Sequence, residues 1–193
     1  GDPGAQYNLG NMYRDGKGVA QDYKKAVQWT QKAADQGFSD AQFQLGTMYY
    51  NGDGVVLDYK KAVRWFRKAA DQGEASAQYR IGNMYHDGEG FSQDFTEAAR
   101  WYRKSADQGF SHAQFKLGVM FDYGEGVSQD LNKAVRWYRK SADQGRADAH
   151  FNLGTMYNNG EGVAQDHNEA VHWYRKSADQ GRADAHFNLG TMY

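Results

Sequence analysis

Apolar and polar residues follow the period of an amphipathic helix in short blocks that end at glycine-rich turns. The block at 41–51 carries apolar side chains at positions i, i+4, i+7 and i+8: Ala41, Leu45, Met48 and Tyr49. This spacing places them on one face of a helix. The block runs into the sequence Asn51-Gly52-Asp53-Gly54, whose two glycines are typical of a tight turn. The pattern predicts one helix followed by one turn.

A second amphipathic block follows each turn and predicts a second helix. In the same stretch of chain its apolar face comprises Ala62, Trp65, Phe66, Ala69 and Ala70. Asp58 precedes the block and is expected to cap it, because an aspartate oxygen accepts a backbone hydrogen bond at a helix start. Two copies add a glutamate at the spacing of a reciprocal capping box: Asp94 with Glu97, and Asp166 with Glu169.

This two-helix block repeats along the whole chain. The stretch WYRKSADQGRADAHFNLGTMY occurs unchanged at 137–157 and 173–193, an offset of 36 residues. All five tryptophans and all six methionines stand at one position each within the repeat. The sequence predicts a single all-α array at 1–193 of helix–turn–helix repeats. Counted from the recurring alanine, the units are 5–40, 41–76, 77–112, 113–148 and 149–184, with a partial unit at 185–193.

Small residues inside the helices predict close packing. A glycine recurs within every first helix, at Gly10, Gly46, Gly82, Gly118, Gly154 and Gly190. Because glycine costs roughly 1 kcal/mol relative to alanine in a helix, we expect another helix backbone to pass close to it. Each tryptophan stands between small residues, as Trp65 does between Ala62 and Ala69, and is expected to fill a slot in the core.

These features together resemble the Sel-one-like repeat (SLR), a relative of the tetratricopeptide repeat. Each unit carries Ala-x-aromatic-x-(Leu/Ile)-Gly-x-Met-(Tyr/Phe), then Gly-x-Gly-(Val/Phe), an aspartate, Ala-x-x-Trp and a later Ala-Asp-Gln-Gly. The resemblance implies a right-handed superhelical α/α solenoid of 36-residue repeats, with the first helices on the concave side. It also implies an adaptor or scaffold role for other proteins. One secreted branch of the family has a cysteine pair in each repeat, and that disulfide framework does not transfer to this cysteine-free chain.

The first helices carry an aromatic residue away from their main apolar face. On a helical wheel Phe43 lies roughly opposite Leu45 and Met48. The row comprises Tyr7, Phe43, Tyr79, Phe115, Phe151 and Phe187. Two interpretations are open. The rings form a structural ladder that packs on the next unit, or they form the floor of a groove that grips a partner, since aromatic residues dominate binding hot spots.

The positions beside this row differ most between the units. The candidate binding residues among them are Asn11, Asn83, Arg14, Tyr50, His86, Asp122, Tyr123 and Asn158. Because the surrounding frame is constant, these positions are able to encode a preference for a partner. Neutral drift on a solvated face is the alternative.

Charge and composition exclude several partner classes. The chain carries a formal net charge of −1 and no cysteine. A near-neutral balance gives no field that concentrates nucleic acid, and no apolar run is long enough to cross a membrane. On the outer face of a second helix, Arg139 and Lys140 have Asp143 at ion-pair spacing, which indicates an ordinary solvated surface. We expect no nucleic-acid partner and no membrane span.

The sequence shows no arrangement of residues suited to catalysis. The Gly-x-Gly turns lack the preceding strand and the Gly-Lys-Ser/Thr ending of a phosphate-binding loop. His167 and His172 are five residues apart and do not share a helix face, so a metal site is not expected. We predict that the protein is not an enzyme and has no cofactor and no metal.

The leading hypothesis is therefore a non-catalytic protein–protein interaction scaffold that binds a peptide or protein partner in the concave groove. A self-stacking assembly module is one alternative, because neither end of the sequence carries a polar capping unit and copies could meet end to end. A glycan-binding envelope module is the other. The sequence leaves cytoplasm, periplasm and secretion equally open.

Overall fold

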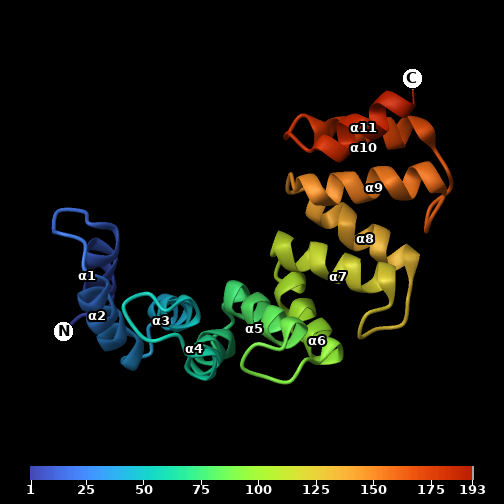
Figure 1. Cartoon of the computed structure of the whole chain (residues 1–193). Helices are drawn as coiled ribbons and strands as arrows, with labels where there is room; N and C mark the ends of the chain where they lie inside the picture. The colour runs from blue at the N-terminus through green and yellow to red at the C-terminus, as the bar shows by residue number, and fades with distance from the viewer. Residues whose placement is uncertain (193) are drawn as a thin grey trace. The chain divides into compact units, whose positions relative to one another are not determined.

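The computed structural model describes residues 1–192, and the described chain consists of helices joined by turns (Figure 1). The helices are α1 (Pro3–Asp15), α2 (Tyr23–Asp35), α3 (Ser39–Asn51), α4 (Tyr59–Asp71), α5 (Ala75–Asp87), α6 (Phe95–Asp107), α7 (Ser111–Tyr123), α8 (Leu131–Ala142), α9 (Ala147–Asn159), α10 (His167–Ala178) and α11 (Ala183–Thr191). The predicted succession of paired helices is confirmed. None of the described helices is long and apolar enough to cross a membrane.

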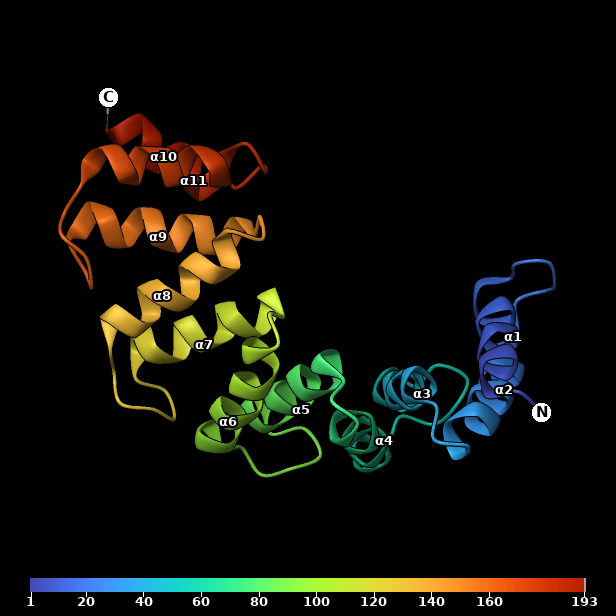
Figure 2. The ribbon, with the colours of Figure 1, turned by 180° about the vertical axis from the view of Figure 1, so that it is seen from behind.

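The chain forms two compact bodies, which are described separately. The N-terminal body is Gly1–Asp94, with α1 to α5, and the C-terminal body begins at Phe95, with α6 to α11. Within each body, every helix packs against the next one along the chain, as both views show (Figures 1 and 2). The prediction of one continuous array across the two bodies stays a prediction.

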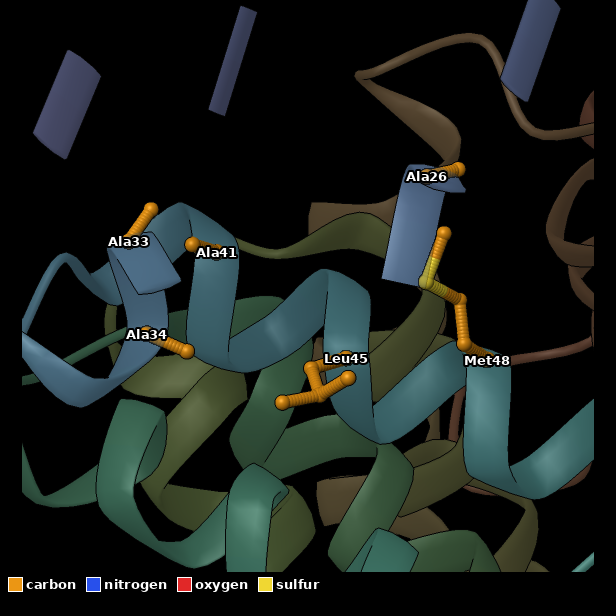
Figure 3. Packing of buried hydrophobic residues seen from close by; sticks show 6 residues of the cluster. All are labelled: Ala26, Ala33, Ala34, Ala41, Leu45 and Met48. Atoms are coloured by element: carbon orange, nitrogen blue, oxygen red, sulfur yellow. The ribbon is translucent and has the colours of Figure 1, made fainter. Parts of the chain in front are cut away.

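The core of each body lies between consecutive helices and is built largely from alanine. In the N-terminal body, Ala33 and Ala34 of α2 face Ala41 and Leu45 of α3, and all four are at most 1% exposed (Figure 3). The small side chains allow the helices to approach closely, and Met48 closes the cluster against Ala26. The predicted apolar stripe of the first helix is thereby confirmed.

The aspartate caps form as predicted, but the capping box at Asp166 does not. Asp58 Oδ1 accepts a hydrogen bond from the Lys61 amide at 2.9 Å. The reciprocal half of the predicted box at Asp166 is missing, because the Asp166 amide donates to the Tyr157 carbonyl at 3.0 Å. Glu169 instead accepts from Trp173 Nε1 at 3.0 Å. The Asp166 amide, which a capping box would use as a donor to Glu169, is bonded instead to a carbonyl at the end of the first helix.

At the other predicted box, the amide of the aspartate makes the same backbone bond. The Asp94 amide donates to the Tyr85 carbonyl at 2.9 Å. Glu97 pairs with Arg100 at 2.6 Å within α6. In the hairpin of α9 and α10, the bond from the capping aspartate Asp166 ties the end of the first helix to the start of the second one.

The helical glycines face a ring rather than a backbone, which corrects the sequence prediction. A Cβ added to Gly118 would lie 2.6 Å from Cδ1 of Tyr138, and one added to Gly154 would lie 2.6 Å from Cδ1 of Tyr174. The ring belongs to the residue after the tryptophan of the paired helix. At Gly10, where Thr30 replaces the ring, the backbone of the second helix comes close as well, with Thr30 N at 3.2 Å.

The tryptophans lie at the edge of the core, and their neighbours fill its centre. Trp137 is 7% exposed, whereas Tyr138 is fully buried. A lysine three residues further along covers the tryptophan ring, with Lys140 Nζ 4.3 Å from the ring centroid. In the N-terminal body Trp65 is only half-buried, and Lys68 lies 4.0 Å from its ring centroid. The predicted core slot is thus occupied chiefly by the next residue.

The Gly-x-Gly turns fasten one hairpin to the preceding one. Gly52 and Gly54 have φ angles of 82° and 73°, as the turn pattern predicts. A Cβ on Gly54 would collide with the carbonyl of Tyr23 at the start of α2. The second glycine therefore permits close contact between repeats, and the turn has a packing role.

A glutamine of the Ala-Asp-Gln-Gly segment links consecutive repeats. Gln72 Nε2 donates to the Gly37 carbonyl at 3.0 Å and to Gln42 Oε1 at 2.8 Å. Gln144 makes the same two bonds in the C-terminal body, to the Gly109 carbonyl and to Gln114. These bonds give the repeats a fixed register.

Candidate functional site

The aromatic row of the first helices is largely part of the packing. The ring centroids of Phe115 and Tyr138 are 5.7 Å apart, and those of Phe151 and Tyr174 are 5.6 Å apart. Each ring therefore rests on the buried ring of its own hairpin. Phe43 packs on Phe66 in the same way, at 5.6 Å.

The other side of the row meets the residue that precedes the next first helix. The Arg146 guanidinium lies 5.0 Å from the centroid of Phe115, and that of Arg182 lies 4.3 Å from Phe151. In the first hairpin a phenylalanine has this place, and Phe38 packs on Tyr7 at 5.4 Å. The rings thus contact the linking residues that precede the next first helix.

One member of the row differs from the others in exposure. Tyr79 on α5 is half-buried, as are the others described above. Phe187 on α11, the last helix that the structure describes, is 72% exposed. A partner-binding role of the row stays a prediction.

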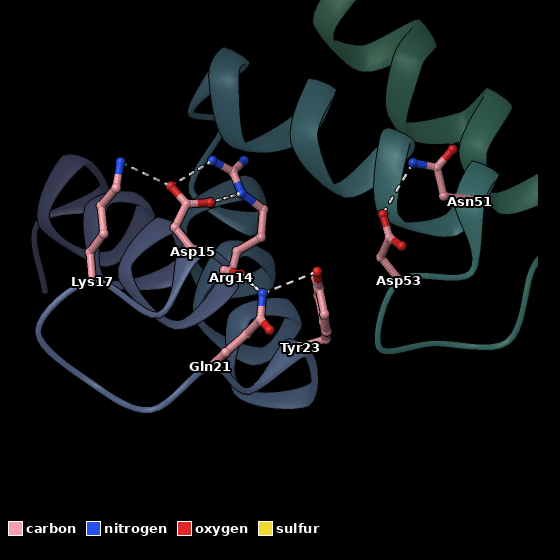
Figure 4. Close-up of polar contacts among 7 residues, drawn as sticks. All are labelled: Arg14, Asp15, Lys17, Gln21, Tyr23, Asn51 and Asp53. Atoms are coloured by element: carbon pink, nitrogen blue, oxygen red, sulfur yellow. Dashed lines mark hydrogen bonds and ion pairs between the residues drawn. The ribbon is translucent and has the colours of Figure 1, made fainter.

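The variable residues gather where a first helix ends and the turn begins. In the first hairpin Arg14 Nε donates to Asp15 Oδ1 at 2.7 Å, and Lys17 approaches the same carboxylate at 3.6 Å (Figure 4). The hydrogen bond from Arg14 lowers the pKa of Asp15 below its usual range. The negative charge of Asp15 is therefore balanced by two cations of the same hairpin, Arg14 and Lys17.

A glutamine in the turn fixes the backbone at this position, which sequence analysis missed. Gln21 Nε2 donates to the Arg14 carbonyl at 2.7 Å (Figure 4). The same bond recurs from Gln93 to His86, from Gln129 to Asp122 and from Gln165 to Asn158, at 2.7 to 2.8 Å. The recurrent glutamine before each capping aspartate was the available signal.

The second hairpin lacks this glutamine and exposes apolar side chains instead. Leu57 stands in its place and is 49% exposed, and Val56 beside it is 87% exposed. The Tyr50 carbonyl therefore loses the side-chain bond that its equivalents accept. Asn51 and Asp53 nearby hydrogen bond to each other at 3.1 Å (Figure 4).

Tyr50 fills its own site in the N-terminal body. Its hydroxyl donates to Glu89 Oε2 at 2.6 Å, and its ring packs on Tyr59 at 5.3 Å. Arg80 lies 6.0 Å from the ring centroid. The hydrogen bond to the Glu89 carboxylate, together with burial, raises the pKa of Tyr50 to about 12. This arrangement leaves little room for a partner side chain.

The equivalent place in the C-terminal body is an open pocket. Asp122 and Tyr123 at the end of α7 line a cavity of about 360 Å³ together with Leu131 of α8, Phe151 and Asn152 of α9, and Glu161 of the next turn. Tyr123 is 71% exposed. The pocket brings together three predicted site residues, Asp122, Tyr123 and Phe151.

Asp122 is held at the bottom of this pocket by the core ring. The Tyr138 hydroxyl donates to Asp122 Oδ2 at 2.9 Å. Burial raises the pKa of Asp122, and the nearby Glu161 carboxylate raises it further, against the lowering effect of the Tyr138 hydrogen bond. Glu161 itself forms no ion pair or side-chain hydrogen bond with the residues that the structure describes.

The remaining predicted residues lie in three separate places. His86 contacts Asp87, with Nδ1 2.6 Å from Oδ1, and Asn83 is half-buried on α5. Asn158 Nδ2 donates to Asn159 at 3.2 Å and lines a second cavity of about 340 Å³. Asn11 is half-buried on α1, and its Oδ1 is buried without a hydrogen bond.

The outer basic face does not form the predicted ion pairs. Arg139 donates to the Tyr157 hydroxyl of the next hairpin, and Lys140 covers Trp137. Asp143 forms no ion pair with either of them, since both cations are engaged elsewhere. Within the described residues, no group of three or more histidine, aspartate or glutamate side chains is arranged to hold a metal ion.

A family comparison assigns this architecture. The model of the Sel1 repeat matches residues 3–38, 39–74, 75–110, 111–145 and 147–181. The chain therefore belongs to the Sel1 repeat family, the all-α solenoid class that the motifs resemble. Proteins of this family are generally non-catalytic scaffolds for protein interaction. No protein among the curated ones matches the chain.

Solved structures agree with this assignment. A protective antigen of uropathogenic Escherichia coli strains that displays an SLR fold is 42% identical, with a TM-score of 0.97 over 98% of this chain. The chain spans 41% of the length of that antigen. A Sel1 repeat protein from Oxalobacter formigenes is 38% identical, covers 100% of this chain and 78% of its own, and has a TM-score of 0.91. An immunity protein from Pseudomonas aeruginosa is 23% identical over 95% of this chain and 67% of its own, with a TM-score of 0.59, and shares the fold alone.

Proposed function

We propose that the protein is a non-catalytic scaffold that binds a protein or peptide partner through the ends of its first helices and the adjoining turns. The observation that carries this proposal is that a constant backbone arrangement presents different side chains in different repeats. Gln21 and its equivalents hold the backbone of four such sites in the same way. The side chains that this frame presents are chemically different, as arginine, histidine, aspartate and asparagine.

The open pocket at Asp122 supports the proposal most directly. Hot-spot residues of protein interfaces are enriched in tyrosine and arginine, and they pack into pockets surrounded by less important contacts. Tyr123 is 71% exposed at the rim of a cavity, which is the placement of such an anchor. The aromatic row contributes by holding the first helices in place, since its rings rest on the core.

A capture experiment tests the scaffold function. The immobilised protein is exposed to an extract of its source cells, and the retained proteins are compared between wild type and Tyr123→Ala. The matched control is Arg136→Ala, an exposed side chain on the outer face of α8. We expect Tyr123→Ala to lose a partner that wild type and Arg136→Ala both retain. Equal retention by all three proteins contradicts the proposed surface.

The same preparation separates this function from self-association. A scaffold for other proteins keeps one mass in solution over a wide range of protein concentration. A mass that rises with concentration, without any captured partner, favours the self-stacking alternative. Analytical ultracentrifugation measures this mass directly.

A further inference from the structure

The pocket at Asp122 lacks the positive charge that the protein supplies at equivalent positions elsewhere. In the first hairpin Arg14 stands at the place of Asp122. In the second, Arg80 stands at the place of Asn152 and lies over the ring of Tyr50. The residues that line the pocket include two carboxylates, Asp122 and Glu161, and no basic side chain.

We propose that this pocket binds a basic side chain, arginine or lysine, of the partner protein. The inference rests on the scaffold function above and specifies the chemistry of the partner at one point.

The geometry of the pocket suits a long cationic side chain. Tyr138 donates to Asp122 Oδ2, so the second oxygen of that carboxylate is left to accept from a ligand. Glu161 offers a second carboxylate at the rim without a cation of its own. A guanidinium presents several donors in one plane and is able to bond to both groups.

The walls of the pocket match the rest of such a side chain. Leu131 and Phe151 provide apolar surface for a methylene stem, because long basic side chains bury their stems and keep the charged group in a polar place. The exposed ring of Tyr123 offers a face for a cation–π contact. The protein itself makes a contact of this kind in the following hairpin, where the Arg182 guanidinium lies over the ring of Phe151.

The electrostatics of the pocket support the same conclusion. Asp122 is partly removed from water and lies near a second negative charge, and both effects raise its pKa. A cation between Asp122 and Glu161 relieves this repulsion. In the N-terminal body the equivalent carboxylate, Glu89, already receives the Tyr50 hydroxyl and needs no outside partner.

Nuclear magnetic resonance of the full chain tests the inference with small probes. The ¹⁵N-labelled protein is titrated with N-acetyl-arginine methylamide and with its neutral isostere, N-acetyl-citrulline methylamide. We expect both probes to be followed by the chemical shifts of the side-chain amides of Gln129 and Asn152. The dissociation constant of the arginine probe is expected to be at least tenfold lower than that of the citrulline probe. Equal effects of the two probes, or shifts spread over acidic residues of both bodies, overturn the inference.

A charge-neutral variant of the same shape provides the second arm. Asp122→Asn with Glu161→Gln removes both charges, and the asparagine oxygen still accepts from Tyr138. We expect arginine binding to fall at least tenfold in this variant and to be unchanged in the control Glu89→Gln. Undiminished binding by the double variant refutes the inference. Thermal melts confirm that all variants are folded.

The capture experiment then separates the two proposals. If Tyr123→Ala loses the partner while the charge-neutral variant keeps it, the scaffold function is supported and the inference that the pocket binds a basic side chain is wrong. If the arginine probe binds specifically but no protein is retained, the pocket stands and the scaffold function is wrong.

Discussion

The sites at Tyr50 and Asp122 occupy the same place in two hairpins, yet one is closed and the other open. At the first, the Tyr50 hydroxyl donates to Glu89, and the Tyr50 ring packs at a tilt on Tyr59 and lies 6.0 Å from the Arg80 guanidinium. At the second, the shorter Asp122 turns to the core and accepts from Tyr138, and a cavity of about 360 Å³ remains. The repeat frame therefore tolerates very different side chains without changing its backbone.

The residue beneath each site explains part of this difference. Under Asp122 lies Tyr138, whose hydroxyl holds the carboxylate. Its equivalent under Tyr50 is Phe66, which has no hydroxyl to donate. A carboxylate at position 50 would have no such partner, and a tyrosine there is free to turn outward. Core and surface are thus coupled through Tyr138 and Asp122 in the hairpin of the open site.

The largest expected effect follows from removing the core ring under the open site. Tyr138 is fully buried, so Tyr138→Ala is expected to lower the free energy of unfolding by about 3–5 kcal/mol. Urea titration followed by circular dichroism measures this loss. The control Tyr123→Ala removes an exposed ring of the same type and is expected to cost less than about 0.5 kcal/mol. Similar losses for the two variants would show that the ring under the site is not a core residue.

The second effect tests the fit between first and second helices. Gly118→Ala places a methyl group 2.6 Å from the Tyr138 ring and is expected to cost about 1–3 kcal/mol, although alanine favours the helix. The control is Gly190→Ala, where nothing lies within 4 Å of the added atom. There we expect no loss, or a small gain in stability. A stabilising Gly118→Ala would refute the close ring contact.

A third pair of variants exchanges the turn residue, glutamine or leucine, between the two sites. Leu57→Gln restores the hydrogen bond to the carbonyl of Tyr50 and removes an exposed apolar side chain. Its expected gain is about 1 kcal/mol. Gln129→Leu in the open site is the mirror change and is expected to lose a similar amount, because the Asp122 carbonyl then loses its partner. If both variants melt at the wild-type temperature, the glutamine does not brace the turn.

The smallest effect concerns pH. The pKa of Asp122 is raised in the folded protein, so its charged form disfavours folding above that pKa. This penalty is relieved as the pH falls through the folded pKa, and it changes no further below the ordinary aspartate value. We expect the stability of wild type, relative to Asp122→Asn, to rise as the pH is lowered from 7 through this range. Melting temperatures whose difference is independent of pH would contradict the raised pKa.

The sequence predicts the helices well and the sites only in part, as the duplicated block shows. Phe151 and Phe187 stand in identical 21-residue stretches, yet the first is half-buried and the second is 72% exposed. His150 is 4% exposed, while its copy His186 is exposed. Helix periodicity is local and is readable from one repeat. The burial of Phe151 comes from Tyr174 of α10 and from Arg182. A pattern within one helix does not predict contacts with residues so far along the chain.

The same reasoning applies to the candidate residues. Asp122 and Tyr123 were identified because they vary within a constant frame, and the structure places them at one pocket. The capping box at Asp166 is incomplete because the Asp166 amide bonds to a carbonyl of the preceding helix. Sequence spacing measures neighbours along the chain, whereas these outcomes depend on competition between groups from different helices.

Exchanging the closed site into the open one tests the central claim most directly. The variant Asp122→Tyr/Leu131→Tyr/Asn152→Arg gives the C-terminal body the side chains that fill the site at Tyr50. The measurement is the amount of partner that the variant retains from the source extract, relative to wild type, with folding verified by circular dichroism. Our account predicts that the helices persist and that the partner retained through Tyr123 is lost. Retention at the wild-type level by the folded variant would show that partners bind elsewhere on the protein.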